Sequence, residues 1–332
     1  MPRNSLLLLL SMTVAAAPLK NYTCASCHRE EARTQPQTPM GIGIQLPPDQ
    51  TLLKTNPKLT FEKNGYKYAI ERKGDHSTYT VTDGTATLTL PIRYAFGVHS
   101  QTFVLEHEGR FYESMVSYYQ PVGGLAITMG DEQKPRRNLV EAMGVALAGK
   151  EAAACFACHS SGAVSHGELN TAALKPGLDC EHCHPGANAH MEALAQGKQA
   201  PLPRKLGQLA AEDMSNFCGA CHRTWDTVLK LGPWGQVNVR FQPYRLANSK
   251  CFLGDDRRIG CTACHDPHAP LVRDESSYDA KCLACHQQQK PCPVSKDKCT
   301  VCHMPKVELP GSHANFTDHY IRVVRKGDPY PN

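Results

Sequence analysis

The region between residues 58 and 117 alternates hydrophobic and polar side chains with the period of two that half-buried β-strands show. Tyr66, Tyr68 and Ile70 recur at every second position, as do Tyr79 and Val81. No cysteine occurs in this region. The segments that we expect to form strands are residues 58–63, 66–71, 78–82, 85–90, 102–106 and 111–117.

Turn signals separate several of these segments. Asn64-Gly65 and Asp83-Gly84 are dipeptides typical of two-residue β-hairpins, and Glu108-Gly109 indicates a third turn. Short alternating strands joined by tight turns form antiparallel sheets. We therefore predict an antiparallel β module over residues 56–130.

A helical period replaces the alternation after residue 135. From Arg136 to Ala154 the pattern is helical, with an apolar stripe through Leu139, Val140, Met143, Leu147 and Ala154, and it leads directly into the cysteine-rich part of the chain. Further along the chain, proline, glycine and short helical pieces dominate. The fold class expected is α+β: mostly short helices and loops, with an inserted antiparallel β module.

The N-terminus has the pattern of a signal peptide. A short segment carrying Arg3 precedes an apolar run from Leu6 to Ala17, which is too short to span a bilayer. Pro18 disfavours cleavage directly before it, so we expect cleavage after Ala16 and a signal peptide over residues 1–16. No later segment is long and apolar enough to cross a membrane. The predicted location is periplasmic or extracellular.

The sequence Cys-x-x-Cys-His occurs seven times and uses fourteen of the sixteen cysteines. Residues i, i+3 and i+4 of a helical turn share a face, so two thiols and an imidazole converge on one object. This arrangement is the attachment motif of c-type haem, with two thioethers and one axial imidazole. The expected haem-attaching residues are Cys24, Cys27 and His28; Cys155, Cys158 and His159; Cys180, Cys183 and His184; Cys218, Cys221 and His222; Cys261, Cys264 and His265; Cys282, Cys285 and His286; and Cys299, Cys302 and His303.

Zinc binding and dithiol redox chemistry are the competing interpretations of a Cys-x-x-Cys motif. Zinc sites usually take two such pairs, whereas seven is odd, and zinc does not require histidine after each second cysteine. A thioredoxin-like motif would occur once. The predicted cofactors are therefore seven covalently bound haem c groups, each with an iron.

The motifs are unevenly spaced, and this predicts how the chain is organised. The first lies in an N-terminal segment, residues 17–55, and six crowd into residues 155–303 within a hexahaem domain over residues 131–332. About 25 residues for each haem are too few to enclose it separately. We expect the haems to share walls, to replace much of the apolar core and to form an electron path.

Nine further histidines could supply second axial ligands, which would give low-potential, electron-transferring haems. We expect His190, His268, His313 and His319 to serve in this way, and we rank His166 and His99 after them. The remaining candidates are weaker: His76 and His107 as surface residues, His182 on an attachment turn, and Met40 as a thioether ligand. Seven irons outnumber these six histidines, so at least one iron could stay five-coordinate and open.

Charge and the two remaining cysteines add little about partners. The formal net charge is +5, becomes +4 without Arg3, and reaches about −3 once seven ferric haems each contribute about −1. No basic stripe for nucleic acid is present. Cys251 and Cys292 remain outside the motifs, and a disulfide between them is expected in an oxidising compartment.

Residues 24–41 and 155–323 resemble the multihaem c-type cytochromes of the cytochrome c-552/c-554 family, which includes the tetrahaem carrier of the hydroxylamine-oxidation pathway. The similarity lies in GLDCEHCHPGANAH, SKCF, GCTACHDPH, KCLACH, CPVSKDKCTVCHMPK, SHANFTDHYIRV and the N-terminal CASCHREEARTQPQTPMG. The resemblance implies stacked and perpendicular haem pairs, mostly with two histidine ligands. It implies distal roles for His190, His268 and one or both of His313 and His319, and it favours the Cys251–Cys292 disulfide. Seven haems instead of four argue against transferring that carrier's partner.

The leading functional hypothesis is an exported electron-transfer cytochrome whose partners are redox proteins. No nucleophile or acid–base constellation was found, so no catalytic residue is assigned. The alternative is an oxidoreductase that acts on a small nitrogen or sulfur compound at one five-coordinate haem. A third hypothesis has the β module docking to a membrane redox complex or stacking subunits, although a scaffold role is favoured.

Overall fold

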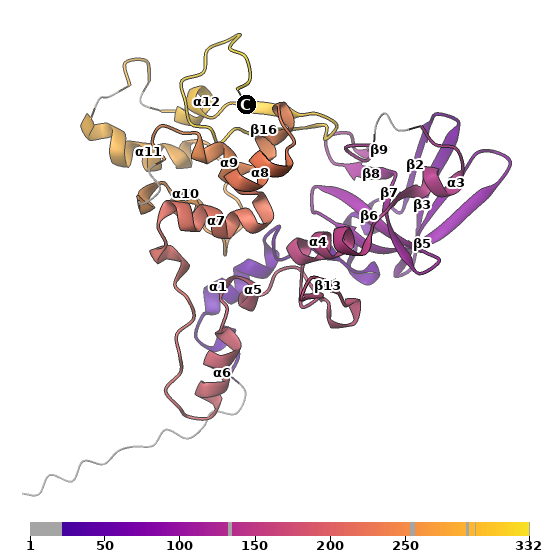
Figure 1. The fold of residues 1–332 in the computed structure, drawn as a ribbon, viewed down its shortest axis with the longest axis horizontal. Coiled ribbons are helices and arrows are strands. Elements are labelled where there is room, and N and C mark those ends of the chain that lie inside the picture. Colours follow the sequence, from indigo (N-terminus) through magenta and orange to yellow (C-terminus); the bar gives the residue numbers. More distant parts are fainter. Residues whose placement is uncertain (1–21, 132–134, 253–255, 290–291, 296, 332) are drawn as a thin grey trace, which may run out of the picture.

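The computed structural model describes residues 22–331, apart from 132–134, 253–255, 290–291 and 296. Within these residues the fold is α+β, as predicted. A ten-stranded antiparallel sheet curls into a half-barrel, and short helices form the other part of the molecule (Figure 1). The predicted signal peptide over residues 1–16 lies outside the described residues.

Seven strands form the main path of the sheet in the order β10-β7-β6-β5-β4-β3-β2, while β1 pairs with β5 and β8 joins β6 to β9. Alternating side chains of β3 and β4 enter the core, where Tyr68, Ile70, Tyr79 and Val81 are at most 3% exposed. The period of two seen in the sequence therefore reflects one buried face. The strands are β1 (Ile44–Gln45), β2 (Lys58–Lys63), β3 (Tyr66–Lys73), β4 (His76–Thr82), β5 (Thr87–Phe96), β6 (Ser100–His107), β7 (Arg110–Ser114), β8 (Val116–Tyr119), β9 (Gly124–Ile127) and β10 (Gly144–Ala146).

Two of the three predicted hairpin turns are confirmed, and one is longer than predicted. Asn64-Gly65 and Glu108-Gly109 have positive φ at both residues and join strands directly, as a two-residue turn requires. Asp83-Gly84 instead belongs to a four-residue loop between Thr82 and Thr87. The Asp83 carboxylate accepts hydrogen bonds from the backbone N–H groups of Thr85 and Ala86, which stabilises the longer loop.

The helical pattern over residues 136–154 is confirmed only in part. The chain forms α3 (Leu139–Met143), then strand β10, then α4 (Gly149–His159). Gly144 pairs with Ser114 of β7, and its Cα lies so close to the carbonyl oxygen of Glu113 that a side chain would collide with that oxygen. Pairing with a distant strand therefore overrides the local helical pattern.

The sheet also differs in detail from the predicted strands. The expected strand over 111–117 is two strands, β7 and β8, separated by Met115, whose N–H donates to the carbonyl of Met143. Strands β1, β9 and β10 were not predicted. Because β1 and β10 lie outside residues 56–130, the sheet draws on segments from both sides of the predicted module.

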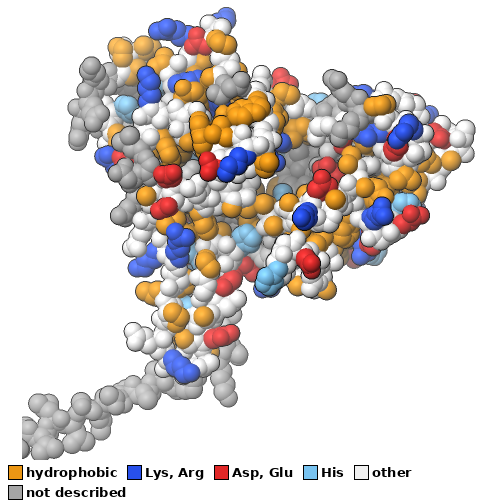
Figure 2. Space-filling view, in the orientation of Figure 1, with side chains coloured by type: hydrophobic (Ala, Val, Ile, Leu, Met, Phe, Trp, Pro, Cys, Tyr) orange, Lys and Arg blue, Asp and Glu red, His pale blue; other side chains and the backbone are white. Residues whose placement is uncertain are grey.

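The remaining elements are short, and their apolar core is small. Within the described residues, the main cluster of the sheet contains seventeen buried hydrophobic residues, whereas the cluster in the helical part contains only Val228, Phe241 and Tyr244. Hydrophobic side chains lie open on the surface of the helical part (Figure 2), including Leu231 at 76% and Trp234 at 54% exposure. The helical part thus lacks the core that its size would need.

Most helices lie in this second part (Figure 1). No helix among the described residues is both long and apolar enough to cross a membrane. The helices are α1 (Arg29–Thr34), α2 (Thr51–Thr55), α3, α4, α5 (Cys180–Cys183), α6 (Ala187–Ala195), α7 (Ala211–His222), α8 (Trp225–Leu231), α9 (Gln242–Ala247), α10 (Cys261–Cys264), α11 (Ser276–Gln289) and α12 (Cys299–His303). Three two-stranded sheets pair β11 (Ser160–Ser161) with β14 (Lys175–Pro176), β12 (Val164–Ser165) with β13 (Glu168–Leu169), and β15 (Lys306–Leu309) with β16 (Ala314–Thr317).

Candidate functional site

All seven Cys-x-x-Cys-His motifs lie on helical turns, as the spacing predicts. The first is on a 3-10 turn (Cys24–Ser26), and the others are on α4, α5, α7, α10, α11 and α12. Two of these helices are a single turn long. In each, the backbone N–H of the motif histidine donates to the carbonyl of the first cysteine and so completes the turn, at 2.8 Å in the third motif and 2.9 Å in the fifth. Each motif therefore carries its two thiols and its imidazole on one turn.

Each of the sixteen cysteine residues is at least partly exposed, and no disulfide joins any two of them. Many of the thiols are nevertheless partly enclosed, since burial raises the pKa of Cys155, Cys183 and Cys264. The expected disulfide between Cys251 and Cys292 is not formed in this structure. Both residues are exposed, although burial raises the pKa of the Cys251 thiol. The backbone N–H groups of Ser295 and Val294 lower the pKa of Cys292 by stabilising its thiolate.

Thiols of different motifs lie close enough to shift one another's pKa, and these pairs do not follow sequence order. Cys221 of the fourth motif lowers the pKa of Cys158 in the second to about 7, and Cys261 of the fifth raises the pKa of Cys218 in the fourth. Burial, together with Cys24 of the first motif, raises the pKa of Cys180 in the third, and burial together with Cys282 of the sixth raises that of Cys299 in the seventh. These four pairs link the motifs in three groups: the first with the third, the second with the fourth and fifth, and the sixth with the seventh.

Five imidazoles are oriented by a main-chain carbonyl. A carbonyl oxygen can only accept, so Nδ1 carries the proton and Nε2 keeps its lone pair. Histidines that bind metals usually have this second hydrogen bond, which fixes both the tautomer and the ring orientation. The five Nδ1 contacts are His159 to Gly43 at 3.0 Å, His184 to Arg204 at 3.4 Å, His190 to Pro201 at 2.8 Å, His303 to Arg322 at 3.0 Å and His319 to Thr317 at 3.0 Å.

Two motif histidines each lie close to a predicted second ligand. The ring centroids of His184 and His268 are 6.0 Å apart and nearly parallel, and those of His265 and His319 are 6.2 Å apart. Two imidazoles that bind one metal from opposite sides through Nε2, at metal–nitrogen distances of ~2 Å, have centroids roughly 6 Å apart. Both separations therefore fit an axial pair of histidines at an iron.

Burial keeps the better enclosed of these rings neutral. It lowers the pKa of His319 to about 4, and it lowers the pKa of His265 as well. A neutral imidazole is the form that binds a metal. The second pair therefore has the protonation state of ligands at neutral pH.

The other histidine candidates are not paired with a motif imidazole in the described part of the chain. His190 lies on α6, and His313 packs its ring against Tyr119 at 5.0 Å. His166 is exposed at the turn of the β12–β13 hairpin. Nε2 of His99, the atom that would bind a metal, accepts a hydrogen bond from Arg273 at 2.8 Å.

The weaker candidates lie apart from these contacts. His76 begins β4 and His107 ends β6, so both belong to the sheet, whereas His182 lies on α5 inside the third motif. Met40 contributes its backbone carbonyl, which accepts from the N–H of Leu178 at 3.0 Å.

The sheet holds the second motif in place through Phe156, which lies between its two cysteines. Phe156 is completely buried, and its ring contacts Tyr94 at 5.0 Å, Phe96 at 5.3 Å and Phe111 at 5.9 Å. Phe96 also contacts the ring of His159 at 4.9 Å. The aromatic side chains of β5 and β7 therefore fix the helix that carries this motif.

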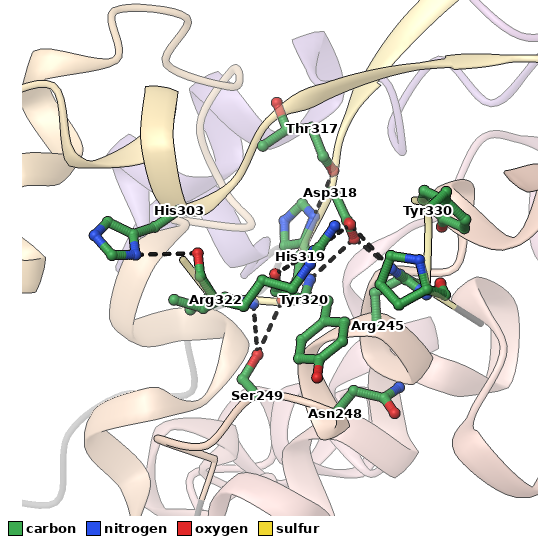
Figure 3. Close-up of polar contacts among 12 residues, drawn as sticks. Arg245, Asn248, Ser249, His303, Thr317, Asp318, His319, Tyr320, Arg322 and Tyr330 are labelled. Carbon is green, nitrogen blue, oxygen red and sulfur yellow. Dashed lines mark hydrogen bonds and ion pairs between the residues drawn. The ribbon is translucent and has the colours of Figure 1, made fainter. Parts of the chain in front are cut away.

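Sequence reasoning missed the groups that orient the imidazoles. The five carbonyls are main-chain atoms, which no motif reveals. It also missed a buried network around Asp318 and Arg245, next to His319 (Figure 3). The only available signal was the position of Asp318 directly before a predicted ligand.

Within the described residues, no three His, Cys, Asp or Glu side chains converge as a zinc site would require. The side chains instead meet in pairs of thiols and pairs of imidazoles. No family model, no curated protein and no solved structure matches this chain. The assignment of the site therefore depends on the chemistry of its own residues.

Proposed function

We propose that this chain is an exported heptahaem c-type cytochrome that transfers single electrons along closely packed, mostly bis-His haems. One observation carries the proposal: seven Cys-x-x-Cys-His motifs lie on helical turns, and each turn carries two thiols and an imidazole together. When bound, haem iron supplies one-electron oxidation and reduction. We propose redox proteins as donor and acceptor, and a periplasmic or extracellular location.

The residues of the chain have distinct roles in this proposal. The paired motif thiols would hold the cofactor covalently, and the motif histidines would bind its iron. His268 would be the second ligand beside His184, and His319 the second ligand beside His265, because the ring centroids of these pairs lie 6.0 and 6.2 Å apart. Carbonyls at Nδ1 keep such rings in the tautomer that leaves Nε2 free for the metal.

The packing supports electron transfer between motifs. Thiols of neighbouring motifs lie close enough to shift one another's pKa within three groups of motifs, so cofactors attached within one group would be neighbours. The small apolar core and open hydrophobic surface of the helical part support the same proposal, since porphyrin would supply the missing apolar volume.

The packing of the sheet on α4 favours a scaffold role for the β module. A face of the sheet that holds Phe156 of the second motif is not free for a membrane redox complex. Docking to such a complex would have to use another surface.

An oxidoreductase is the second candidate, and one observation favours it. Among the described residues, a ring contact with a predicted second ligand is found for His184 and His265 but for none of the other five motif histidines. The bis-His proposal for most haems therefore relies on His190, His313, His166 and His99 to serve other motifs. A haem with one open axial position could bind a small nitrogen or sulfur compound.

Spin state tests both proposals. The exported ferric protein should give an electron paramagnetic resonance spectrum in which most haems are low-spin, and a redox titration should take up seven electrons per chain. A spectrum in which most haems are high-spin would contradict the electron-transfer proposal. Nitrite, hydroxylamine or nitric oxide should perturb one haem if the oxidoreductase proposal is correct. If all seven are six-coordinate and inert to these ligands, that second proposal fails.

A further inference from the structure

A completely buried ion pair lies beside His319. Arg245 of α9 and Asp318 both have 0% exposure, and Nε and Nη2 of the arginine donate to the two carboxylate oxygens at 2.8 and 2.9 Å (Figure 3). Nη1 of Arg322 and the N–H of Tyr320 donate to the same carboxylate, at 2.7 and 3.0 Å. Four hydrogen bonds therefore fix Asp318 in one orientation.

The guanidinium of Arg245 is fixed from its other side. Its Nη1 donates to the carbonyl of Pro331 at 2.9 Å and to Oδ1 of Asn238 at 3.3 Å, and the hydroxyl of Tyr330 donates to the same Asn238 oxygen at 2.7 Å. The arginine thus connects α9, the 3-10 turn before it (Gln236–Arg240) and residues 330–331 near the end of the chain. A buried ion pair is costly to desolvate, and well-packed apolar side chains often give equal stability. The directed geometry of this pair therefore needs a reason beyond stability.

The network controls the backbone on both sides of His319. The residue before it is the buried aspartate. On the other side, the hydroxyl of Ser249 donates to the carbonyl of His319 at 3.2 Å and accepts from the N–H of Ile321 at 2.8 Å. The ring itself donates from Nδ1 to Thr317 and lies 6.2 Å from the ring of His265. Little freedom is left for the imidazole to move away from its partner.

We propose that the Arg245–Asp318 pair, together with Ser249, positions His319 as the second axial ligand of the haem attached at the fifth motif. This inference rests on the proposed function, because it assumes a haem bound by His265. These are positioning residues: they act through His319 and do not touch the iron. Removing such outer contacts typically lowers the affinity of a ligand for its metal by about 10- to 100-fold.

The test uses the exported holoprotein and three variants. His319→Gly is the reference, and it should convert one of the seven haems to high-spin, which added imidazole restores to low-spin. Arg245→Lys keeps the positive charge but loses the bidentate hydrogen bonding to Asp318. Ser249→Ala is a milder change that is expected to fold. Both should bind added imidazole at one haem at concentrations about 10-fold or more below those that affect the wild type. As the control, Arg136→Lys alters a largely buried pair with Asp131 beside the sheet and should bind imidazole as the wild type does.

The outcomes separate this inference from the proposed function. If His319→Gly opens one haem but both Arg245→Lys and Ser249→Ala bind imidazole as the wild type does, the positioning role is refuted. If Arg245→Lys does not fold, imidazole binding by Ser249→Ala alone tests the positioning role. If His319→Gly changes no haem, His319 is not a ligand and the inference fails while the cytochrome proposal stands. Absence of covalent haem from the wild type would overturn the proposed function itself.

Discussion

Replacing Phe156 by alanine tests whether the sheet holds the second motif. The side chain is completely buried, and three aromatic rings contact it with centroids 5.0 to 5.9 Å away, two of them edge-on. Truncating a buried phenylalanine costs about 3–5 kcal/mol, because apolar contacts are lost and a cavity remains. We expect a loss within this range, since strands β5 and β7 can move little to fill the gap.

Val301 provides a matched control because it lies between the two cysteines of the seventh motif, yet is 56% exposed. Val301→Ala should change the free energy of unfolding by at most about 0.5 kcal/mol. Urea unfolding of both holoprotein variants, followed by circular dichroism of the tyrosine-rich sheet, gives the comparison. A loss below about 1 kcal/mol for Phe156→Ala, or similar losses for both variants, would refute the anchoring of α4 by the sheet.

Three further substitutions test other parts of the account. His268→Gly should convert the haem of the third motif to high-spin in the paramagnetic resonance spectrum, and an unchanged spectrum would contradict the proposed axial pair. Asp318→Asn should lower the free energy of unfolding in urea by about 3–5 kcal/mol by leaving a buried arginine unpaired, whereas Glu106→Gln in an exposed ion pair should cost at most about 1 kcal/mol; equal losses would contradict this reasoning. Gly144→Ala should destabilise the sheet by about 1–3 kcal/mol through backbone collision, whereas Gly149→Ala, where a new Cβ meets nothing within 4 Å, should be neutral or stabilising in the same urea assay.

Features that depend on local sequence could be predicted. Alternation located six strand segments, because each strand of the sheet buries one face. The turn at Asn64-Gly65 was found because both residues tolerate positive φ. The helical turns of the seven motifs follow from the spacing of their cysteines and histidines alone.

Features that depend on distant parts of the chain could not be predicted. Gly144 leaves the helical pattern because it pairs with Ser114, thirty residues away in sequence. The rings of His184 and His268 come from different motif segments, so spacing could rank His268 as a ligand but could not give its partner. The carbonyls that orient the imidazoles are present at every residue and leave no signal in the sequence.

The central claim is that all seven motifs carry covalent haem, and the intact mass of the exported protein tests it most directly. We expect the mass of the mature chain plus seven haems, stable to acid and organic solvent. A double variant, Cys24→Ser with Cys27→Ser, should carry six. A wild-type mass equal to the bare chain, with free thiols or bound zinc at these motifs, would contradict the account.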